Sequence, residues 1–336
     1  MRTLTKRNLL SVADLAPSEV QEILDLAASD KNQQSDHLAG KTLGMLFFDR
    51  SLRTRVSFEV AMVQLGGNCI NIFADHEIYD LTPEEQVVMD GPAEEHVKDA
   101  ARTLSRYVDG LGVRQISQTG NWERDRLDLV LRGYAEHATV PVVNLESLQE
   151  HPCQAISDVY TIREHYKELA GRKLTLAWSN HPQPTGMGAS HSILTLASMM
   201  GMNVTVAHPL GFELDEEAMQ RAEEFAQQAG GSVQVTNDLN QGARGADVLY
   251  ARSWGSTKYW DDAERESMIK RSMQSWQIDE DLMGLTSDAL FMHPLPVRRN
   301  VAVTDAVLDG PRSVVYEQAE NRVHVQKALL RRLLGD

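Results

Sequence analysis

Short apolar runs alternate with helical patterns along almost the whole chain, and no other sequence feature constrains the fold as strongly. Runs such as 42–48 and 173–179 are largely apolar, as is typical of parallel strands buried on both faces. Between such runs, apolar residues recur at helical spacing, for example in the helix expected from Pro17. The sequence therefore predicts an α/β protein whose parallel sheets are covered by helices on both faces.

The chain of 336 residues is long enough for two such sheets, each with its own core. The first half contains expected strands at 42–48, 68–73, 110–113 and 140–144. A helix expected to begin at Gln154 then leads to a fresh series of strands. We expect one domain over residues 1–150 and a second over residues 151–320.

Composition excludes several classes of partner. The formal net charge of −15 disfavours nucleic acid and anionic membranes, because the diffuse field repels both. No apolar run is long enough for a membrane span, and the stretch from Met1 to Arg7 does not begin a secretion signal. Cys69 and Cys153 are the two cysteines, which fits a reducing compartment. We expect a cytoplasmic protein that binds neither membrane nor nucleic acid.

The stretch Ser51-Leu52-Arg53-Thr54-Arg55 lies where the first expected strand turns into a helix carrying Val56, Val60, Val63 and Leu65. The first backbone N–H groups of a helix have no partner within it, and the helix dipole is positive there. Two hydroxyls and two guanidiniums add donors that suit phosphate oxygens. The alternative is a capped helix with solvated arginines.

The order of residues from Ser51 to Arg55 resembles the Ser-x-Arg-Thr-Arg phosphate-binding signature of the aspartate/ornithine carbamoyltransferase family. Four later segments match the same family in order, namely Arg114, His151-Pro152-Cys153-Gln154, His293-Pro294-Leu295-Pro296 and Arg322. The resemblance implies two doubly wound parallel-sheet domains, the first for carbamoyl phosphate and the second, knotted, for the amine acceptor. It also implies that a terminal helix over residues 321–336 returns to the first domain.

The resemblance further implies a transfer that needs neither metal nor cofactor. Arg114 and His151 would donate to the carbonyl oxygen, where charge builds in the transition state. Gln154 and the backbone carbonyl of Leu295 would accept from the carbamoyl NH2 group, and Arg322 completes the catalytic set. The residues expected to bind carbamoyl phosphate are Ser51, Leu52, Arg53, Thr54, Arg55, Tyr79 and Leu295.

Other segments resemble the subgroup that uses N-acylated ornithine in place of ornithine. Glu94 matches a position where a glutamate goes with the acetyl substrate and a proline with the succinyl one; a carboxylate would repel the free carboxylate of a succinyl group. Arg252 and Arg298 are candidates for the substrate α-carboxylate, and Glu146 for the acyl-amide N–H. The family implies a homotrimer with the site at the subunit interface. The rival interpretations are the succinylornithine enzyme and a catalytically silent protein that binds carbamoyl phosphate.

Several residues depart from the subgroup or suggest other chemistry. The departures are Ala302, Arg252 and Pro294, together with Tyr79, which replaces a tryptophan that reaches the neighbouring subunit. Gly186-Met187-Gly188 lacks the third glycine of a dinucleotide site. The serine acyl-enzyme spacing from Ser267 to Lys270 has no supporting motif, and we expect helix surface there. His181, His191 and His208 are expected in loops and caps.

Overall fold

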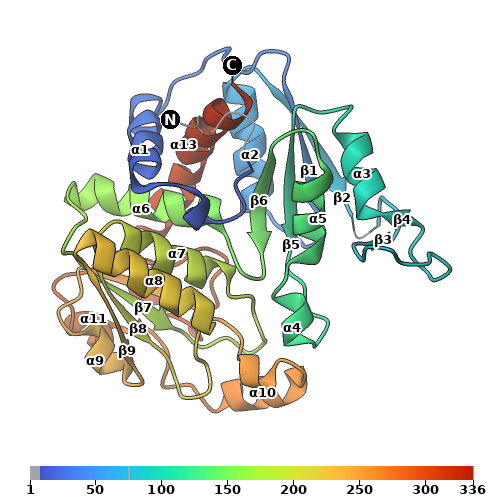
Figure 1. Ribbon diagram of the computed structural model, residues 1–336. Helices are drawn as coiled ribbons and strands as arrows, with labels where there is room; N and C mark the ends of the chain where they lie inside the picture. The colour runs from blue at the N-terminus through green and yellow to red at the C-terminus, as the bar shows by residue number, and fades with distance from the viewer. Residues whose placement is uncertain (1–7, 75, 336) are drawn as a thin grey trace. The chain divides into compact units, whose positions relative to one another are not determined.

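The computed structural model describes residues 8–74 and 76–335, so the amino-terminal stretch considered above lies outside the described part. The chain forms two compact units (Figure 1). Unit 1 is built from Met1–Gln118, Glu123–Cys153 and Arg322–Asp336, and unit 2 from Thr119–Trp122 and Gln154–Asn321. Each unit has its own parallel sheet.

The sheet of unit 1 contains four parallel strands in the order β2-β1-β5-β6. Their bounds are Asn68–Phe73 for β2, Thr42–Phe47 for β1, Gly110–Gln115 for β5 and Val142–Ser147 for β6. Since all four run the same way, the turn after β1, Arg114 and Glu146 lie at one edge of the sheet. This edge is where open α/β sheets bind ligands.

Helices cover this sheet much as the hydrophobic spacing predicts. Their bounds, together with those of two short strands, are η1 Val12–Asp14, α1 Pro17–Ser29, α2 Arg53–Gln64, β3 Leu81–Thr82, β4 Glu95–His96, α3 Val97–Leu104, α4 Trp122–Asp125 and α5 Leu129–His137. Helices α4 and α5 are separate, because Asp128 between them adopts a φ of 47° that interrupts helical geometry. Helix α3 begins at Val97, directly after strand β4.

Helix α2 forms where it is expected, and three of the valines that mark it in the sequence lie on its outward face. Val56, Val60 and Val63 are 50%, 36% and 64% exposed. The buried side chains of α2 are instead Thr54, Ser57, Phe58, Ala61 and Met62. Both faces of the helix therefore carry apolar groups, and the more branched set faces outward.

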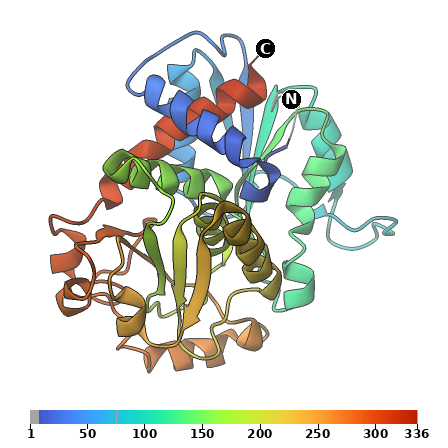
Figure 2. The same cartoon turned by 60° about the vertical axis from the view of Figure 1, so that its left-hand side comes forward.

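The sheet of unit 2 contains five parallel strands in the order β11-β10-β7-β8-β9. Their bounds are Leu290–Met292, Val248–Arg252, Lys173–Trp178, Asn203–Ala207 and Ser232–Thr236 in that order. Helices α7 (Gly188–Met199) and α8 (Glu216–Ala229) lie side by side over it (Figures 1 and 2). Every residue of α7 is buried, which explains why its sequence shows no polar face.

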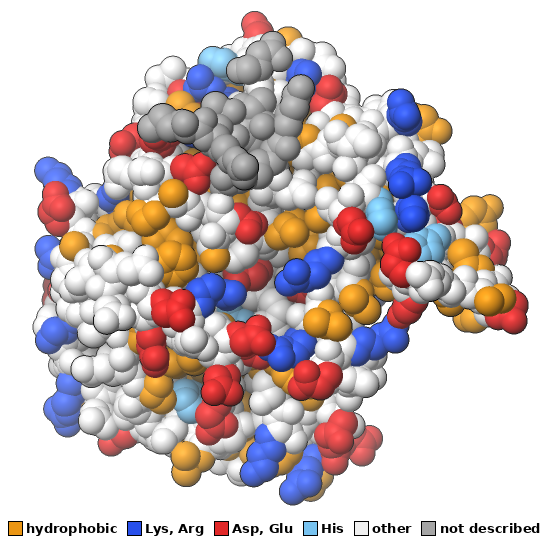
Figure 3. Space-filling view, viewed as in Figure 1, with side chains coloured by type: hydrophobic (Ala, Val, Ile, Leu, Met, Phe, Trp, Pro, Cys, Tyr) orange, Lys and Arg blue, Asp and Glu red, His pale blue; other side chains and the backbone are white. Residues whose placement is uncertain are grey.

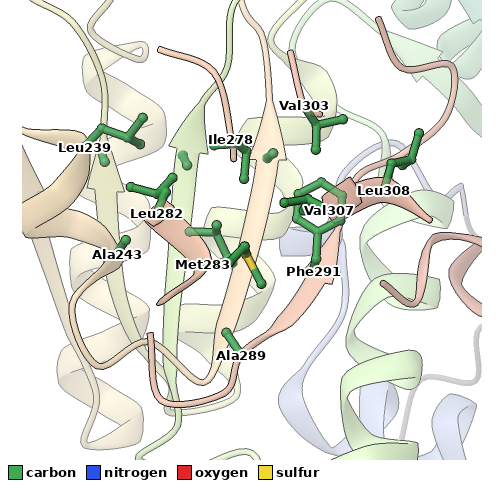
Figure 4. Close-up of a cluster of buried hydrophobic side chains, with 14 of the residues drawn as sticks. Leu239, Ala243, Ile278, Leu282, Met283, Ala289, Phe291, Val303, Val307 and Leu308 are labelled. Carbon is green, nitrogen blue, oxygen red and sulfur yellow. The ribbon is translucent and has the colours of Figure 1, made fainter. Parts of the chain in front are cut away.

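Three short helices supply a second hydrophobic cluster of unit 2: α9 (Leu239–Ala243), α11 (Glu280–Gly284) and α12 (Asp305–Leu308). Figure 4 shows their side chains lying against the strands together with Ile278, Phe291 and Val303. Ala177, Ala207 and Ala251 contribute from three neighbouring strands. Small residues on this face of the sheet leave room for the larger side chains that pack on it.

Two helices contain the boundaries between the units: α6 (Pro152–Tyr166) and α13 (Val315–Leu334). Helix α13 begins six residues before the expected Asn321, because Val315 is already buried in the core of unit 2. The remaining helices are η2 (Thr257–Tyr259) and α10 (Ala263–Arg271). Within the described residues, no helix combines the length and apolar character that crossing a bilayer requires.

Candidate active site

The turn after β1 forms the start of α2. The hydroxyl oxygen of Ser51 accepts a hydrogen bond from the backbone N–H of Thr54 at 3.3 Å, so it caps the first turn of the helix. Leu52 is exposed, and Arg53 is half-buried in the first turn. The guanidinium of Arg55 lies 4.8 Å from the centre of the Phe73 ring, an arrangement that restricts its movement. The junction thus combines a helix amino terminus with two cations.

Arg322 of α13 reaches this same turn. Its Nη2 donates to the hydroxyl oxygen of Thr54 at 2.8 Å, and both side chains are buried. Cys153 lies near Arg322, yet burial raises the pKa of its thiol to about 12, and the Arg322 charge opposes only part of that rise. Cys153 is therefore a protonated, buried residue at neutral pH and not a nucleophile.

Arg114, Glu146 and His151 form a buried cluster at the ends of the neighbouring strands β5 and β6. The Nη1 atom of Arg114 is ion-paired with Oε2 of Glu146. The Nε2 atom of His151 lies 3.5 Å from the same carboxylate oxygen. Because the three side chains are 3% to 8% exposed, solvent screens their charges weakly. A guanidinium and an imidazole are thus held side by side by one carboxylate.

This cluster depends on a register shift between β5 and β6. Val113 pairs with Asn144, but Arg114 pairs with Glu146, so that Leu145 is skipped. Leu145 packs towards Gly112, where a Cβ atom would lie 2.8 Å from its Cδ1. The glycine makes room for the extra residue, and the extra residue brings Glu146 opposite Arg114.

Gln154 belongs to unit 2, where its side chain is fixed by Asp158 one turn along α6. The Nε2 atom of Gln154 donates to Oδ1 of Asp158 at 2.7 Å. Asp158 also accepts from Nε2 of Gln318 at 2.7 Å and from the hydroxyl of Tyr250 at 2.8 Å. Since the amide nitrogen of Gln154 faces a carboxylate, its amide oxygen is the atom directed to hydrogen-bond donors.

A second group of polar side chains gathers at the carboxyl ends of β7, β10 and β11, which are neighbours in the unit 2 sheet. Arg252 ends β10, His181 follows β7, and His293 follows β11. Burial, assisted by the charge of Arg252, lowers the pKa of His293 to about 3. Burial also lowers the pKa of His181 to about 4, with smaller contributions from Lys270, Arg298 and Arg252. Both imidazoles are neutral at pH 7, and the local charge is positive.

Arg298 joins this group through His181. Its Nε donates to Nε2 of His181 at 3.3 Å, and the Nδ1 of His181 lies 2.9 Å from the carbonyl oxygen of Gln183. The backbone N–H of Gln183 also donates to this Nδ1 at 3.2 Å, so Gln183 holds the imidazole through both of its backbone polar groups. Leu295 is half-buried and precedes Pro296 through a cis peptide bond.

Tyr79 and Glu94 lie in the long segment between β2 and α3. Tyr79 is 64% exposed, and Glu94 is also exposed. Figure 3 shows hydrophobic side chains on the surface of this segment, which exposes Val87, Val88 and Met89. Within unit 1 neither Tyr79 nor Glu94 is brought to the Arg114 cluster by a described contact.

Sequence reasoning missed the supporting roles of His181 and Asp158. His181 was expected to be a plain loop residue, although its place after a strand of the second sheet was a usable signal. Asp158 stands four residues after Gln154, a spacing that brings side chains together on a helix. His191 is not a loop residue, since it is fully buried within α7 and accepts from the backbone of Asp215 at 3.4 Å.

The described residues offer no candidate set of metal ligands. Among residues 8–74 and 76–335, no three His, Cys, Asp or Glu side chains gather in positions that could hold a metal ion.

The turn between β6 and His151 rests on the buried carboxylate of Asp128, which accepts from the backbone N–H groups of Leu148 and Gln149 at 3.1 and 3.4 Å. Burial raises the pKa of Asp128 to about 6, and hydrogen bonds oppose part of that rise. In the unfolded chain an aspartate titrates near 3.9. Between roughly pH 4 and 6 the folded state therefore binds more protons, and its stability falls as the pH rises.

We expect Asp128→Asn to remove this dependence. The free energy of unfolding of the native protein, measured against the variant, should fall by about 3 kcal/mol between pH 4 and 7 and stay level above. Denaturant unfolding at a series of pH values measures it. Asp90→Asn in the exposed loop is the control, and parallel curves for native protein and Asp128→Asn would contradict the assignment.

Both units match models of one family. Residues 7–164 match the carbamoyl-P binding domain of aspartate/ornithine carbamoyltransferase, and residues 187–333 match its Asp/Orn binding domain. Together with two parallel sheets whose basic residues gather at their carboxyl edges, these matches define the class of protein. The chain belongs to the aspartate/ornithine carbamoyltransferase family.

Individual relatives lie in two groups. An N-acetylornithine carbamoyltransferase of Xanthomonas campestris is 39% identical over 98% of each chain. An ornithine carbamoyltransferase of Halalkalibacterium halodurans is also 39% identical, over 99% of this chain and 96% of that protein. The crystal structure of acetylornithine transcarbamylase complexed with acetylcitrulline shares 39% identity, covers 98% of this chain and all of that one, and superposes with a TM-score of 0.96.

Proposed function

We propose that this protein transfers the carbamoyl group of carbamoyl phosphate to the side-chain amine of N-acetyl-L-ornithine. The products are N-acetyl-L-citrulline and phosphate, and the reaction is a step of arginine synthesis. The observation that carries the proposal is the buried Arg114–Glu146–His151 cluster at the same sheet edge as the Ser51–Arg55 turn. Support comes from the relatives named N-acetylornithine carbamoyltransferase.

We assign carbamoyl phosphate to unit 1 and the acceptor to unit 2. The helix amino terminus at Ser51–Arg55, together with Arg322, provides donors and positive charge for the phosphate. In unit 2, Arg252 and the His181-oriented Arg298 provide positive charge for the α-carboxylate of an amino acid. The domain descriptions of the two matching family models support this division.

The chemical step follows from these assignments. The neutral amine attacks the carbonyl carbon, and the Arg114 and His151 donors stabilise the negative charge that builds on the carbonyl oxygen. The amide oxygen of Gln154 and the carbonyl of Leu295 hold the NH2 group in orientation. When the carbon–oxygen bond to phosphate breaks, the amine proton leaves with the phosphate. This chain therefore needs no separate general base.

Glu146 has two tasks in this proposal. It holds Arg114 and His151 in place through one carboxylate oxygen. A carboxylate offers several acceptor directions, so it can also accept the N–H of the acyl amide. An N-acylated acceptor has such an N–H and lacks the α-ammonium of ornithine, and this difference favours the acylated substrate.

We propose that Glu94 selects the acetyl group over the succinyl group. Its exposed carboxylate follows residues 85–92, which are all exposed, as expected for a residue that acts on a neighbouring chain. A succinyl group carries a second carboxylate, which Glu94 would repel. Structures of related transcarbamylase variants, in which a glutamate is replaced, contain N-succinyl-L-norvaline.

A panel of acceptors tests the function and the role of Glu94 together. The native protein should carbamoylate N-acetylornithine, with little product from N-succinylornithine, ornithine or aspartate, as measured by citrulline colorimetry. Glu94→Pro should raise the ratio of succinyl to acetyl turnover by at least about fivefold, since one unfavourable charge contact costs about 1 kcal/mol or more.

The native protein and a matched variant supply the controls for this assay. Glu85→Pro changes another acid in the same segment and should leave the ratio unchanged. Product from succinylornithine alone would replace the acetyl assignment. No product from any acceptor would support a silent protein that binds carbamoyl phosphate.

We propose that three copies associate through the exposed face of α2. Val56, Val60 and Val63 lie on this face. Strand β2, which follows α2 in the chain and lies at the edge of the sheet, exposes Ile70. Such a row of branched apolar side chains is unfavourable in water, and a neighbouring copy in the proposed trimer would cover it. In that trimer, the exposed segment carrying Tyr79 and Glu94 contributes to the site of a neighbouring copy.

A further inference from the structure

Helix α10 of unit 2 contains an ion pair that is shielded from solvent. The Nζ atom of Lys270 lies 2.9 Å from Oε1 of Glu266 one turn earlier, and the side chains are 0% and 1% exposed. The expectation of helix surface from Ser267 to Lys270 is therefore wrong at Lys270, whereas Met268 is 68% exposed. Enclosing two charges is costly unless each gains further partners.

Aromatic rings surround the lysine. Its Nζ lies 5.8 Å from the ring centre of Trp178 and 5.6 Å from that of Phe212. Trp178 donates through Nε1 to the carbonyl of Trp254 at 3.0 Å, and Trp254 donates to that of Phe212 at 2.8 Å. The ammonium is thus held over ring faces inside a rigid, hydrogen-bonded frame.

Each charge of the pair also bonds to a different loop at the carboxyl edge of the sheet. Lys270 donates to the carbonyl of Gln183 at 3.1 Å, in the loop after β7. Glu266 accepts from the backbone N–H of Ser256 at 3.3 Å, in the loop after β10. The loops are joined directly as well, since the N–H of Gly255 donates to the carbonyl of Thr185 at 2.8 Å.

The carbonyl of Gln183 has a second partner, and this partner leads to Arg298. Nδ1 of His181 lies 2.9 Å from this carbonyl oxygen, to which Lys270 also donates, and the backbone N–H of Gln183 donates to the same Nδ1 at 3.2 Å. His181 in turn accepts from Nε of Arg298 at 3.3 Å. A continuous series of hydrogen bonds therefore connects the buried ammonium to an exposed guanidinium at the sheet edge.

We propose that Lys270, paired with Glu266, is a positioning residue that fixes the backbone of Gln183 and thereby the position of His181 and the direction of Arg298. The inference rests on the proposed function, in which Arg298 binds the acceptor's α-carboxylate. Lys270 itself touches no substrate. The competing explanation is an ion pair that merely stabilises unit 2.

Two variants separate these explanations. Lys270→Met removes the bond to Gln183 and leaves Glu266 buried without its partner, so it should lower the melting temperature. The double variant Glu266→Gln/Lys270→Met removes both charges and should recover most of that loss. In both variants the KM for N-acetylornithine should rise roughly five- to tenfold, while kcat and the KM for carbamoyl phosphate change less than about twofold.

A double variant with native thermal stability and native acceptor KM would overturn the positioning role. Lys258→Met, an exposed lysine of η2, is the matched control and should change none of these quantities. If the native protein carbamoylates no acceptor, the proposed function fails. The positioning role of Lys270 can then still be tested by amide hydrogen exchange. The backbone of residues 181–188 should exchange faster in the double variant than in the native protein, and equal rates would refute the inference.

Discussion

Replacing Arg114 with methionine should lower kcat for carbamoyl transfer by about 10²- to 10³-fold, the usual cost of removing one donor to a developing oxyanion. Arg114 is fixed by Glu146 beside His151, so its guanidinium is preorganised for the carbonyl oxygen. Steady-state citrulline assays measure kcat, and calorimetric titration with carbamoyl phosphate measures binding. Binding should weaken far less than turnover, because the phosphate is assigned to the Ser51–Arg55 turn.

Two further variants show whether the loss is chemical. Arg114→Met leaves Glu146 buried without its cation, whereas Arg114→Met/Glu146→Gln removes that charge and should regain stability but not turnover. Arg332→Met breaks a partly exposed ion pair with Glu22 in the same unit and should leave kcat within about twofold. If Arg114→Met retained more than a tenth of native kcat, Arg114 would not be the oxyanion donor.

Replacing Val63 with glutamate should reduce the molar mass in solution from three chains to one chain of 37.5 kDa. Val63 is 64% exposed on α2, and a charge enclosed in an apolar interface would be left without a partner. Light scattering after gel filtration measures the mass. Activity should fall with it, because the segment carrying Glu94 would no longer reach a neighbouring site.

Val235→Glu provides the matched control, since this valine of β9 is 53% exposed and lies in unit 2. The substitution should leave both mass and activity unchanged. A native protein that sediments as a single chain, or a Val63→Glu variant that keeps the mass of three, would exclude the α2 face as the contact.

The strands could be predicted from the sequence because each is a short run rich in apolar residues between helical patterns. Strand β2 was placed without error, and β1 and β7 to within one residue. The face of α2 could not be predicted. Its outward valines have the spacing of a core stripe, whereas its buried face includes two hydroxyls: that of Thr54 accepts from Arg322, and that of Ser57 donates to the carbonyl of Thr54. Spacing cannot distinguish a face that packs on a sheet from one left exposed.

The candidate site divides in the same way. Arg114, His151 and Arg322 could be proposed because family motifs mark them. The partners that hold them could not, since Glu146 is 32 residues from Arg114 in sequence and meets it only across two strands. Lys270 was expected on a helix surface because no second motif supported the spacing from Ser267, and its enclosure depends on the rings of Trp178 and Phe212 from two distant segments.

The extra residue in β6 makes the length of the chain between Asn144 and Glu146 as important as its composition. Shortening this stretch by a single position would rotate the following side chains to opposite sides of the strand, turning the carboxylate away from the guanidinium. A change of residue type at Leu145 would be far milder. Deleting one residue between Asn144 and Glu146 should therefore reduce activity more than substituting Leu145.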